Sequence, residues 1–175
     1  MPPNEARKIV SIIGASKPSA TSTEAAENLG RLLVDLGYRI VNGGLGGVMA
    51  AASRGARSST AWTEGSTVAI LPGLDAGAAN PWSDIVIPTG LSIGRNLLVV
   101  STGDLVVAVG GGSGTLSEIA LAWQLGKPVI GLDLGEGWSS RLAGEQIDER
   151  RDDVIHRAGS AQEAVQLVDD LLRSD

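Results

Sequence analysis

Short apolar runs alternate along this chain with longer stretches whose apolar residues recur at helical spacing. This alternation limits the possible folds more than any other feature. The apolar runs cover residues 9–13, 38–41, 67–71, 84–87, 105–109 and 128–132. Runs of this length, separated by helical stretches, are typical of parallel strands joined by crossover helices. Because most positions in the runs are apolar, both faces of the predicted sheet must be covered.

The stretches between the runs predict the helices. They cover residues 48–58, 115–125 and 161–172, a segment that carries Arg95 and continues to residue 100, and a segment from Thr21 or Ser22 as N-cap to about residue 36. Residues 136–151 predict a loop or a short helix, and residues 154–155 a last edge strand. The 175 residues suit one domain, residues 1–175. We therefore expect an α/β fold: a Rossmann-like, doubly wound parallel sheet of about six or seven strands with helices on both faces.

The composition narrows the classes of function. There is no cysteine, which rules out disulfides and a thiol nucleophile, and we expect no metal site. The net charge is −6 and no Lys/Arg cluster occurs, so we expect no binding to nucleic acid or to an anionic membrane. A small anionic ligand stays possible, because backbone N–H groups can bind it. No apolar stretch is long enough to span a membrane, and we expect a cytoplasmic protein.

Four glycine-rich or polar turns follow predicted strands. They contain Gly14 and Ser16, residues 43–47, residues 89–95 and residues 110–118. In open parallel sheets, ligands bind beyond the carboxyl ends of the strands. The four turns are therefore expected to meet at one site.

The turn at residues 110–114 is the most specific of the four. It follows a wholly apolar run, four of its five residues are glycine, and a predicted helix comes directly after it. Glycine lets the backbone approach a phosphate, and a helix N-terminus adds partial positive charge. Neither the G-x-G-x-x-G fingerprint nor the Walker Lys-Ser/Thr pattern is present, which argues against a standard NAD enzyme or a P-loop ATPase. The turn thus predicts a phosphate-binding loop of another kind.

Glu118 and Arg95 each have two interpretations. Residues 115–118 (Thr-Leu-Ser-Glu) match a capping box, in which Glu118 bonds the N-cap amide of a helix. Alternatively, Glu118 is a carboxylate beside a phosphate-and-sugar pocket, able to act as a base or to stabilise a cationic sugar. Arg95 is either a surface ion-pair residue or a bidentate phosphate ligand, and its place in an otherwise apolar helical segment favours the second.

These residues carry a resemblance to a known group. Residues 110–118 match the signature P-G-G-x-G-T-x-x-E of the LOG (Lonely Guy, "lysine decarboxylase-like") superfamily, with Gly110 in place of the proline. Residues 42–44 (Asn-Gly-Gly), 47–49 (Gly-Val-Met), 80–91 and 94–96 (Gly-Arg-Asn) look more like the molybdenum cofactor carrier branch of that superfamily. The resemblance covers roughly residues 8–132.

The resemblance implies two functions. The carrier branch binds molybdenum cofactor, a phosphorylated pterin with the outline of a nucleotide, and needs no further cofactor. The alternative is a phosphoribohydrolase, which cleaves a nucleoside 5′-monophosphate of the cytokinin riboside type into base and ribose 5-phosphate. In that case Arg95 would orient the substrate and Glu118 would stabilise the oxocarbenium ion or activate water. The enzymes carry Arg-Lys where this chain has Arg95 and Asn96. A nucleotide-sensing module without turnover is a third, simpler hypothesis.

The predicted site gathers residues from all four turns. The predicted catalytic residues, for the hydrolase only, are Arg95 and Glu118. The predicted ligand- and phosphate-binding residues are Gly14, Ser16, Gly43, Gly44, Gly47, Thr89, Arg95, Asn96, Gly111, Gly112, Ser113, Gly114 and Thr115. Residues 97–100 and 119–125 carry almost no charge, so we also expect a homo-oligomer, a dimer or a tetramer.

Overall fold

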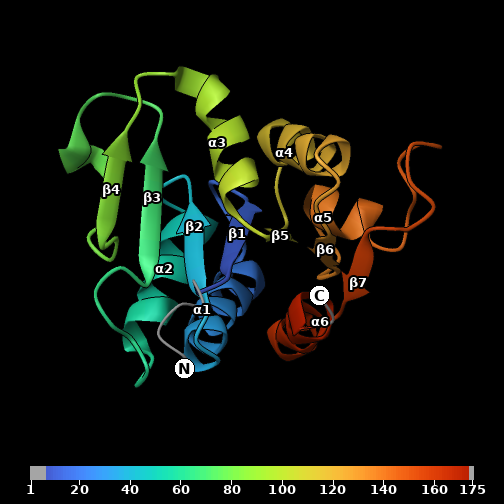
Figure 1. Cartoon of the computed structure of the whole chain (residues 1–175), viewed down its shortest axis with the longest axis horizontal. Helices are drawn as coiled ribbons and strands as arrows, with labels where there is room; N and C mark the ends of the chain where they lie inside the picture. The colour runs from blue at the N-terminus through green and yellow to red at the C-terminus, as the bar shows by residue number, and fades with distance from the viewer. Residues whose placement is uncertain (1–6, 174–175) are drawn as a thin grey trace.

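A computed structural model describes residues 7–173 of the chain. Seven parallel strands form one sheet in the order β4-β3-β2-β1-β5-β6-β7, with β4 and β7 at its edges (Figure 1). The strands are β1 (Ile9–Gly14), β2 (Arg39–Asn42), β3 (Thr67–Leu71), β4 (Ile85–Pro88), β5 (Leu105–Val109), β6 (Val129–Leu132) and β7 (His156–Ala158). The strand order reverses between β1 and β5, which makes the carboxyl ends of these two strands the topological switch point.

Helices cover both faces of the sheet. They are α1 (Ala20–Asp35), α2 (Val48–Ser58), α3 (Arg95–Thr102), α4 (Ser113–Gln124), α5 (Gly137–Leu142) and α6 (Ala161–Arg173), with short 3₁₀ turns η1 (Ala76–Ala78) and η2 (Ser92–Gly94). One core cluster packs α1, α2 and α6 against the sheet, and a second packs α3, α4 and α5 against the other face. The predicted doubly wound parallel sheet is therefore confirmed.

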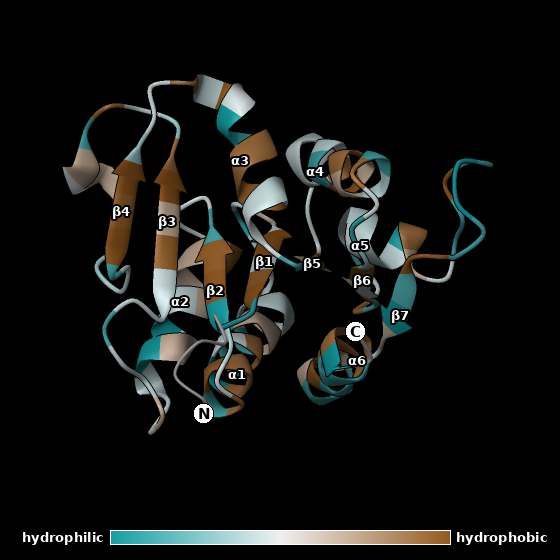
Figure 2. Ribbon diagram, in the orientation of Figure 1, coloured by the Kyte–Doolittle hydropathy of each residue, from teal (hydrophilic) through white to brown (hydrophobic). Residues whose placement is uncertain are grey.

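The apolar runs explain why the strands are central. Every residue of β5 is buried, because it has a strand on each side and helices on both faces. Within β1, Val10 and Ile12 belong to one core cluster and Ile13 to the other. Figure 2 shows β1, β3 and β4 largely in brown, whereas many of the connecting loops are white or teal. Each fully buried aliphatic side chain contributes about 1.5–3 kcal/mol to folding, so this layered burial is the main stabilising term.

Three predicted boundaries are wrong. The N-cap of α1 is Ser19, not Thr21 or Ser22, and its side chain accepts a hydrogen bond from the Ser22 amide at 3.1 Å. Helix α4 begins at Ser113, and its N-cap Gly112 makes no side-chain bond.

Because α4 starts two residues earlier than predicted, Glu118 lies in its second turn. The capping-box interpretation of Glu118 is therefore wrong. The last strand is β7 at residues 156–158, because the backbone of Ile155 pairs with Glu145 and Gly144 instead of the sheet. The short helix α5 confirms the expectation for residues 136–151.

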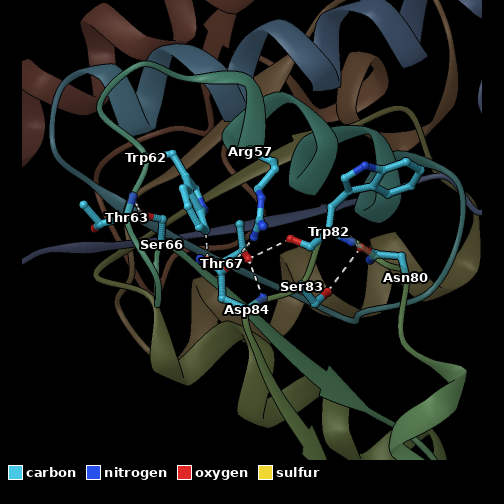
Figure 3. A network of polar contacts seen from close by, with 9 residues as sticks. All are labelled: Arg57, Trp62, Thr63, Ser66, Thr67, Asn80, Trp82, Ser83 and Asp84. Carbon is cyan, nitrogen blue, oxygen red and sulfur yellow. Dashed lines mark hydrogen bonds and ion pairs between the residues drawn. The ribbon is translucent and has the colours of Figure 1, made fainter.

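A buried carboxylate ties the amino ends of β3 and β4 together (Figure 3). The Asp84 side chain is 2% exposed and accepts hydrogen bonds from Trp62 Nε1 (3.1 Å), the Thr67 amide (3.0 Å) and Arg57 (2.9 Å). The Arg57 guanidinium also stacks on the Trp62 ring, 3.8 Å from its centroid.

Asp84→Ala is expected to destabilise the protein by about 3 kcal/mol, because it leaves the Thr67 amide and the indole N–H without their acceptor. Urea unfolding at neutral pH measures this, with the exposed Asp152→Ala as the control of equal charge change. A loss for Asp84→Ala no larger than that for the control would show that the network adds no stability.

Candidate functional site

The carboxyl ends of β1, β2 and β5 and the first residues of α3 and α4 surround a cavity of about 290 Å³. It lies at the switch point, where the topology places ligand sites. Ten predicted site residues line it together: Gly14, Ser16, Gly43, Arg95, Asn96, Gly112, Ser113, Gly114, Thr115 and Glu118. Ile12, Ile13 and Met49 complete the lining.

The glycine turn after β5 presents backbone amides to this cavity. Gly110 and Gly111 adopt left-handed conformations with φ of 61° and 94°, which only glycine adopts without strain. Helix α4 follows at Ser113, and the Leu116 amide donates to Gly112 O. The amides from Ser113 to Thr115 precede that bond, so they are free to bind an anion at the positive end of the helix.

Arg95 is the buried cation of the site. Its side chain is 10% exposed, and its Nε atom has no hydrogen-bond partner among residues 7–173. Its Nη1 atom lies 3.9 Å from Glu118 Oε1, beyond hydrogen-bond distance. Burial lowers the pKa of Arg95, and the Glu118 charge only partly opposes that shift. A buried guanidinium with so few partners is arranged to receive an anion.

The second turn lies close against the Arg95 guanidinium. A Cβ atom at Gly43 would lie 2.2–2.5 Å from the Arg95 guanidinium atoms, so the guanidinium holds its place because residue 43 has no side chain. The fully buried Asn42 holds this turn: its side-chain oxygen accepts from the Gly44 amide at 2.8 Å and its side-chain nitrogen donates to Ser53 Oγ at 3.0 Å. Any side chain at residue 43 would therefore displace Arg95.

Glu118 faces Arg95 from α4. Its side chain is 10% exposed, and burial raises its pKa to about 7, with the Arg95 charge acting in the opposite direction. At neutral pH the carboxyl group is thus partly protonated and can donate or accept a hydrogen bond. Protonation states of this kind are typical of ligand and catalytic sites.

Four predicted residues do not line this cavity. Thr89 donates to Leu71 O at 2.7 Å and accepts from the Leu91 amide, so it shapes the loop after β4. Gly44 and Gly47 have φ of 74° and 65° and serve the turn into α2. Gly111 lies on the other side of the glycine turn, in a neighbouring cavity.

Sequence reasoning missed Asn42 and Asn80 as supports of the site. The residues around Asn80 do not predict that it contacts the second turn. In the structure its backbone amide donates to Gly44 O at 2.8 Å. Asn42 could have been found, since an asparagine before two glycines at a strand end commonly bonds the backbone two residues on.

Two kinds of feature are absent from residues 7–173. No helix in that range is both long and apolar enough to cross a bilayer. The same range contains no group of three or more His, Cys, Asp or Glu side chains that could hold a metal ion.

Comparisons with known proteins identify the family of this chain. The model of the SLOG cluster4 family matches residues 7–165. An uncharacterized protein of Archaeoglobus fulgidus is 40% identical over 123 residues, 70% of this chain and 78% of that protein. The molybdenum cofactor binding protein of Rippkaea orientalis is 32% identical, with a TM-score of 0.83 over 97% of this chain and 99% of that chain.

A eukaryotic structure is also similar. The molybdenum cofactor carrier protein of Chlamydomonas reinhardtii is 28% identical, with a TM-score of 0.79 over 96% of this chain and 99% of that chain. These matches confirm the resemblance to the carrier-like branch. DNA processing protein A of Helicobacter pylori is 24% identical with a TM-score of 0.66, over 95% of this chain and 81% of that chain, and shares the fold alone.

Proposed function

This chain belongs to the SLOG cluster4 family, and from that premise we propose that it binds a phosphorylated, nucleotide-like ligand in the Arg95–Glu118 cavity, as a carrier of molybdenum cofactor. The observation that carries the proposal is the buried Arg95 guanidinium, whose Nε has no partner in residues 7–173. The proteins from Rippkaea and Chlamydomonas, which are named for molybdenum cofactor, support this choice of ligand.

The chemistry of the cavity fits such a ligand. The ligand's phosphate would accept hydrogen bonds from the open amides of Ser113 to Thr115 and charge-assisted bonds from Arg95. Glu118 can pair with ring N–H groups or with hydroxyls. The local positive potential lets a protein of net charge −6 bind an anion.

Calorimetry with the purified protein tests the proposal. Molybdenum cofactor is expected to bind at least tenfold more tightly than AMP, and AMP more tightly than inorganic phosphate, because each adds contacts beyond the phosphate. Equal affinity for cofactor and phosphate would contradict the carrier function.

Hydrolysis is the second candidate, and the observation that favours it is Glu118, with its pKa near 7, opposite Arg95. Water would attack C1′ of a nucleoside 5′-monophosphate as the N-glycosidic bond breaks. The base nitrogen would take a proton from the solvent as the bond breaks, and Glu118 would take the proton of the attacking water and later return it to the solvent. The hydrolase predicts free base from AMP or a cytokinin riboside monophosphate, abolished in Glu118→Gln. If the wild type releases no more free base than the Glu118→Gln variant, the hydrolase hypothesis is wrong.

We also propose that copies of this chain associate through the face formed by β4, η2 and α3, where Figure 2 shows brown residues on β4 and α3. Large apolar side chains are exposed there: Leu74, Ile85, Ile87, Leu91, Ile93, Leu97 and Leu98. Exposed apolar patches on this scale, beside an unpaired edge strand, are typical of subunit interfaces. Residues 119–125 contribute less than their sequence suggested, because Ile119, Ala122 and Trp123 are buried.

Ile93→Glu is expected to convert the oligomer to a monomer, because Ile93 is 84% exposed and a charge there would be buried in the interface. Light scattering coupled to size exclusion measures the mass. Leu36→Glu, on an exposed apolar residue of the opposite helical layer, is the matched control. A wild-type protein that is already monomeric would contradict this proposal.

A further inference from the structure

A second cavity of about 290 Å³ lies beside the first, on the other side of the glycine turn. Its lining comes from the loop after β1, the glycine turn and the loop before α5: Ala15, Ser16, Lys17, Gly111, Gly112, Glu136 and Gly137. Ser16 and Gly112 also line the first cavity. The two cavities thus adjoin at the carboxyl ends of β1 and β5, with the glycine turn between them, and together they are called here the two halves of the groove.

The Glu136 carboxylate is fixed in the wall of the second half. Ser19 Oγ donates to Glu136 Oε1 at 2.5 Å, and the buried Ser22 hydroxyl donates to the same oxygen. The Glu136 amide donates to Ser140 Oγ at 3.1 Å. Two contacts from the start of α1 therefore hold the Glu136 carboxylate, and one contact from α5 holds its backbone.

Helix α5 fastens that wall to the glycine turn. The Gly110 amide donates to Ser139 Oγ at 2.7 Å, the Ser139 amide donates to Gly110 O at 3.1 Å, and the Trp138 amide donates to Gly111 O at 3.0 Å. The backbone thus holds Glu136 and the phosphate-binding amides at a constant separation. A preformed arrangement of this kind is expected where one ligand contacts both.

Two groups in the second half have no partner among residues 7–173: Glu136 Oε2 accepts no hydrogen bond, and Lys17 forms no ion pair or hydrogen bond. The two serine hydroxyls lower the pKa of Glu136, so it is a carboxylate at neutral pH. The second half therefore offers an acceptor for hydroxyl or N–H groups and a cation for phosphate.

We propose that the groove binds a dinucleotide in which two nucleosides are joined through their 5′ phosphates. One nucleoside lies beside Arg95 and Glu118, the bridging phosphates lie on the glycine turn within reach of Lys17, and the second nucleoside presents its ribose hydroxyls or base N–H groups to Glu136. The inference rests on the proposed nucleotide-like binding and extends its ligand class. The volume of each half alone, about 290 Å³, is at the lower limit for small-molecule sites. The two volumes together are well inside the usual range.

Calorimetry with AMP and with diadenosine 5′,5′-pyrophosphate tests the second half. The dinucleotide is expected to bind the wild type at least tenfold more tightly than AMP. Glu136→Gln, which keeps an acceptor for the serines but presents a donor to the ligand, is expected to reduce dinucleotide affinity toward that of AMP while AMP affinity is unchanged. Lys17→Met is expected to weaken binding of the dinucleotide more than binding of AMP. Glu24→Gln, an exposed residue of α1, is the control of equal charge change.

The outcomes separate this inference from the proposed function. If AMP binding depends on Arg95 and the dinucleotide binds no more tightly than AMP, the dinucleotide inference is wrong and the proposed function stands. A loss of AMP affinity in Glu136→Gln would also overturn it, because it would place Glu136 in the first half. Binding of neither compound would overturn both proposals.

Discussion

Replacement of Arg95 by methionine is expected to weaken AMP binding at least 100-fold and, at pH 6, to stabilise the unliganded protein by about 1 kcal/mol. The affinity falls because the ligand loses its only buried cationic partner in the cavity. The stability rises because a buried guanidinium without adequate hydrogen bonds costs more than a methionine stem of similar shape. Glu118 stays neutral at pH 6, because loss of the Arg95 charge removes the effect that lowers the pKa of Glu118.

Calorimetry and urea unfolding at pH 6 measure the two effects on the same samples. Arg31→Met is the matched control, because it removes an equal charge from an exposed ion pair with Asp35. It should change neither quantity appreciably. An Arg95→Met protein that binds AMP within threefold of the wild type would contradict the placement of phosphate beside Arg95.

Effects of opposite sign would show that Arg95 serves ligand binding at a cost in folding stability. The burial that makes Arg95 a strong anion receptor also destabilises the free protein. The hydrogen bonds of Asn42 hold the second turn in place next to the guanidinium. Ligand binding supplies the missing partners, and we expect it to stabilise the chain by mass action.

The sequence predicted the sheet well, because apolar runs and glycine turns are local signals. All four turns fall at the carboxyl edge, as the topological rule requires, and this brought Arg95 and Glu118 together in one cavity. The start of α4 was missed because its N-cap is Gly112, which contributes no side-chain bond and therefore leaves no sequence signature.

The second half of the groove could not be predicted in the same way. Glu136 meets Ser19 and Ser22 across 117 and 114 residues of chain, and nothing in the pattern around residue 136 marks that contact. Ser139 supports the glycine turn from a segment that looked poorly patterned. Long-range side-chain contacts of this kind depend on the packed backbone, whereas strand and turn signals do not.

Glu118→Gln is expected to stabilise the protein by about 3 kcal/mol at pH 8 and to leave its stability unchanged at pH 4. The pKa of Glu118 rises from 4.5 to about 7 on folding, mainly because the side chain is buried. Below pH 4.5 both states are protonated, and the carboxyl group adds no cost. As the pH rises toward 7 the unfolded chain releases this proton first, so wild-type stability falls across that window. Glutamine is neutral throughout and does not lose this stability.

Urea unfolding of both proteins at pH 4, 6 and 8 measures the difference, with Glu24→Gln on the exposed face of α1 as the control. A difference that is constant across the three values would show that Glu118 titrates normally in the folded chain. Protonation of Glu118 is also coupled to ligand binding. A phosphate beside Arg95 and the Glu118 carboxylate compete for interaction with the Arg95 guanidinium. AMP should therefore bind more weakly to the wild type above pH 7, and Glu118→Gln should remove that part of the pH dependence.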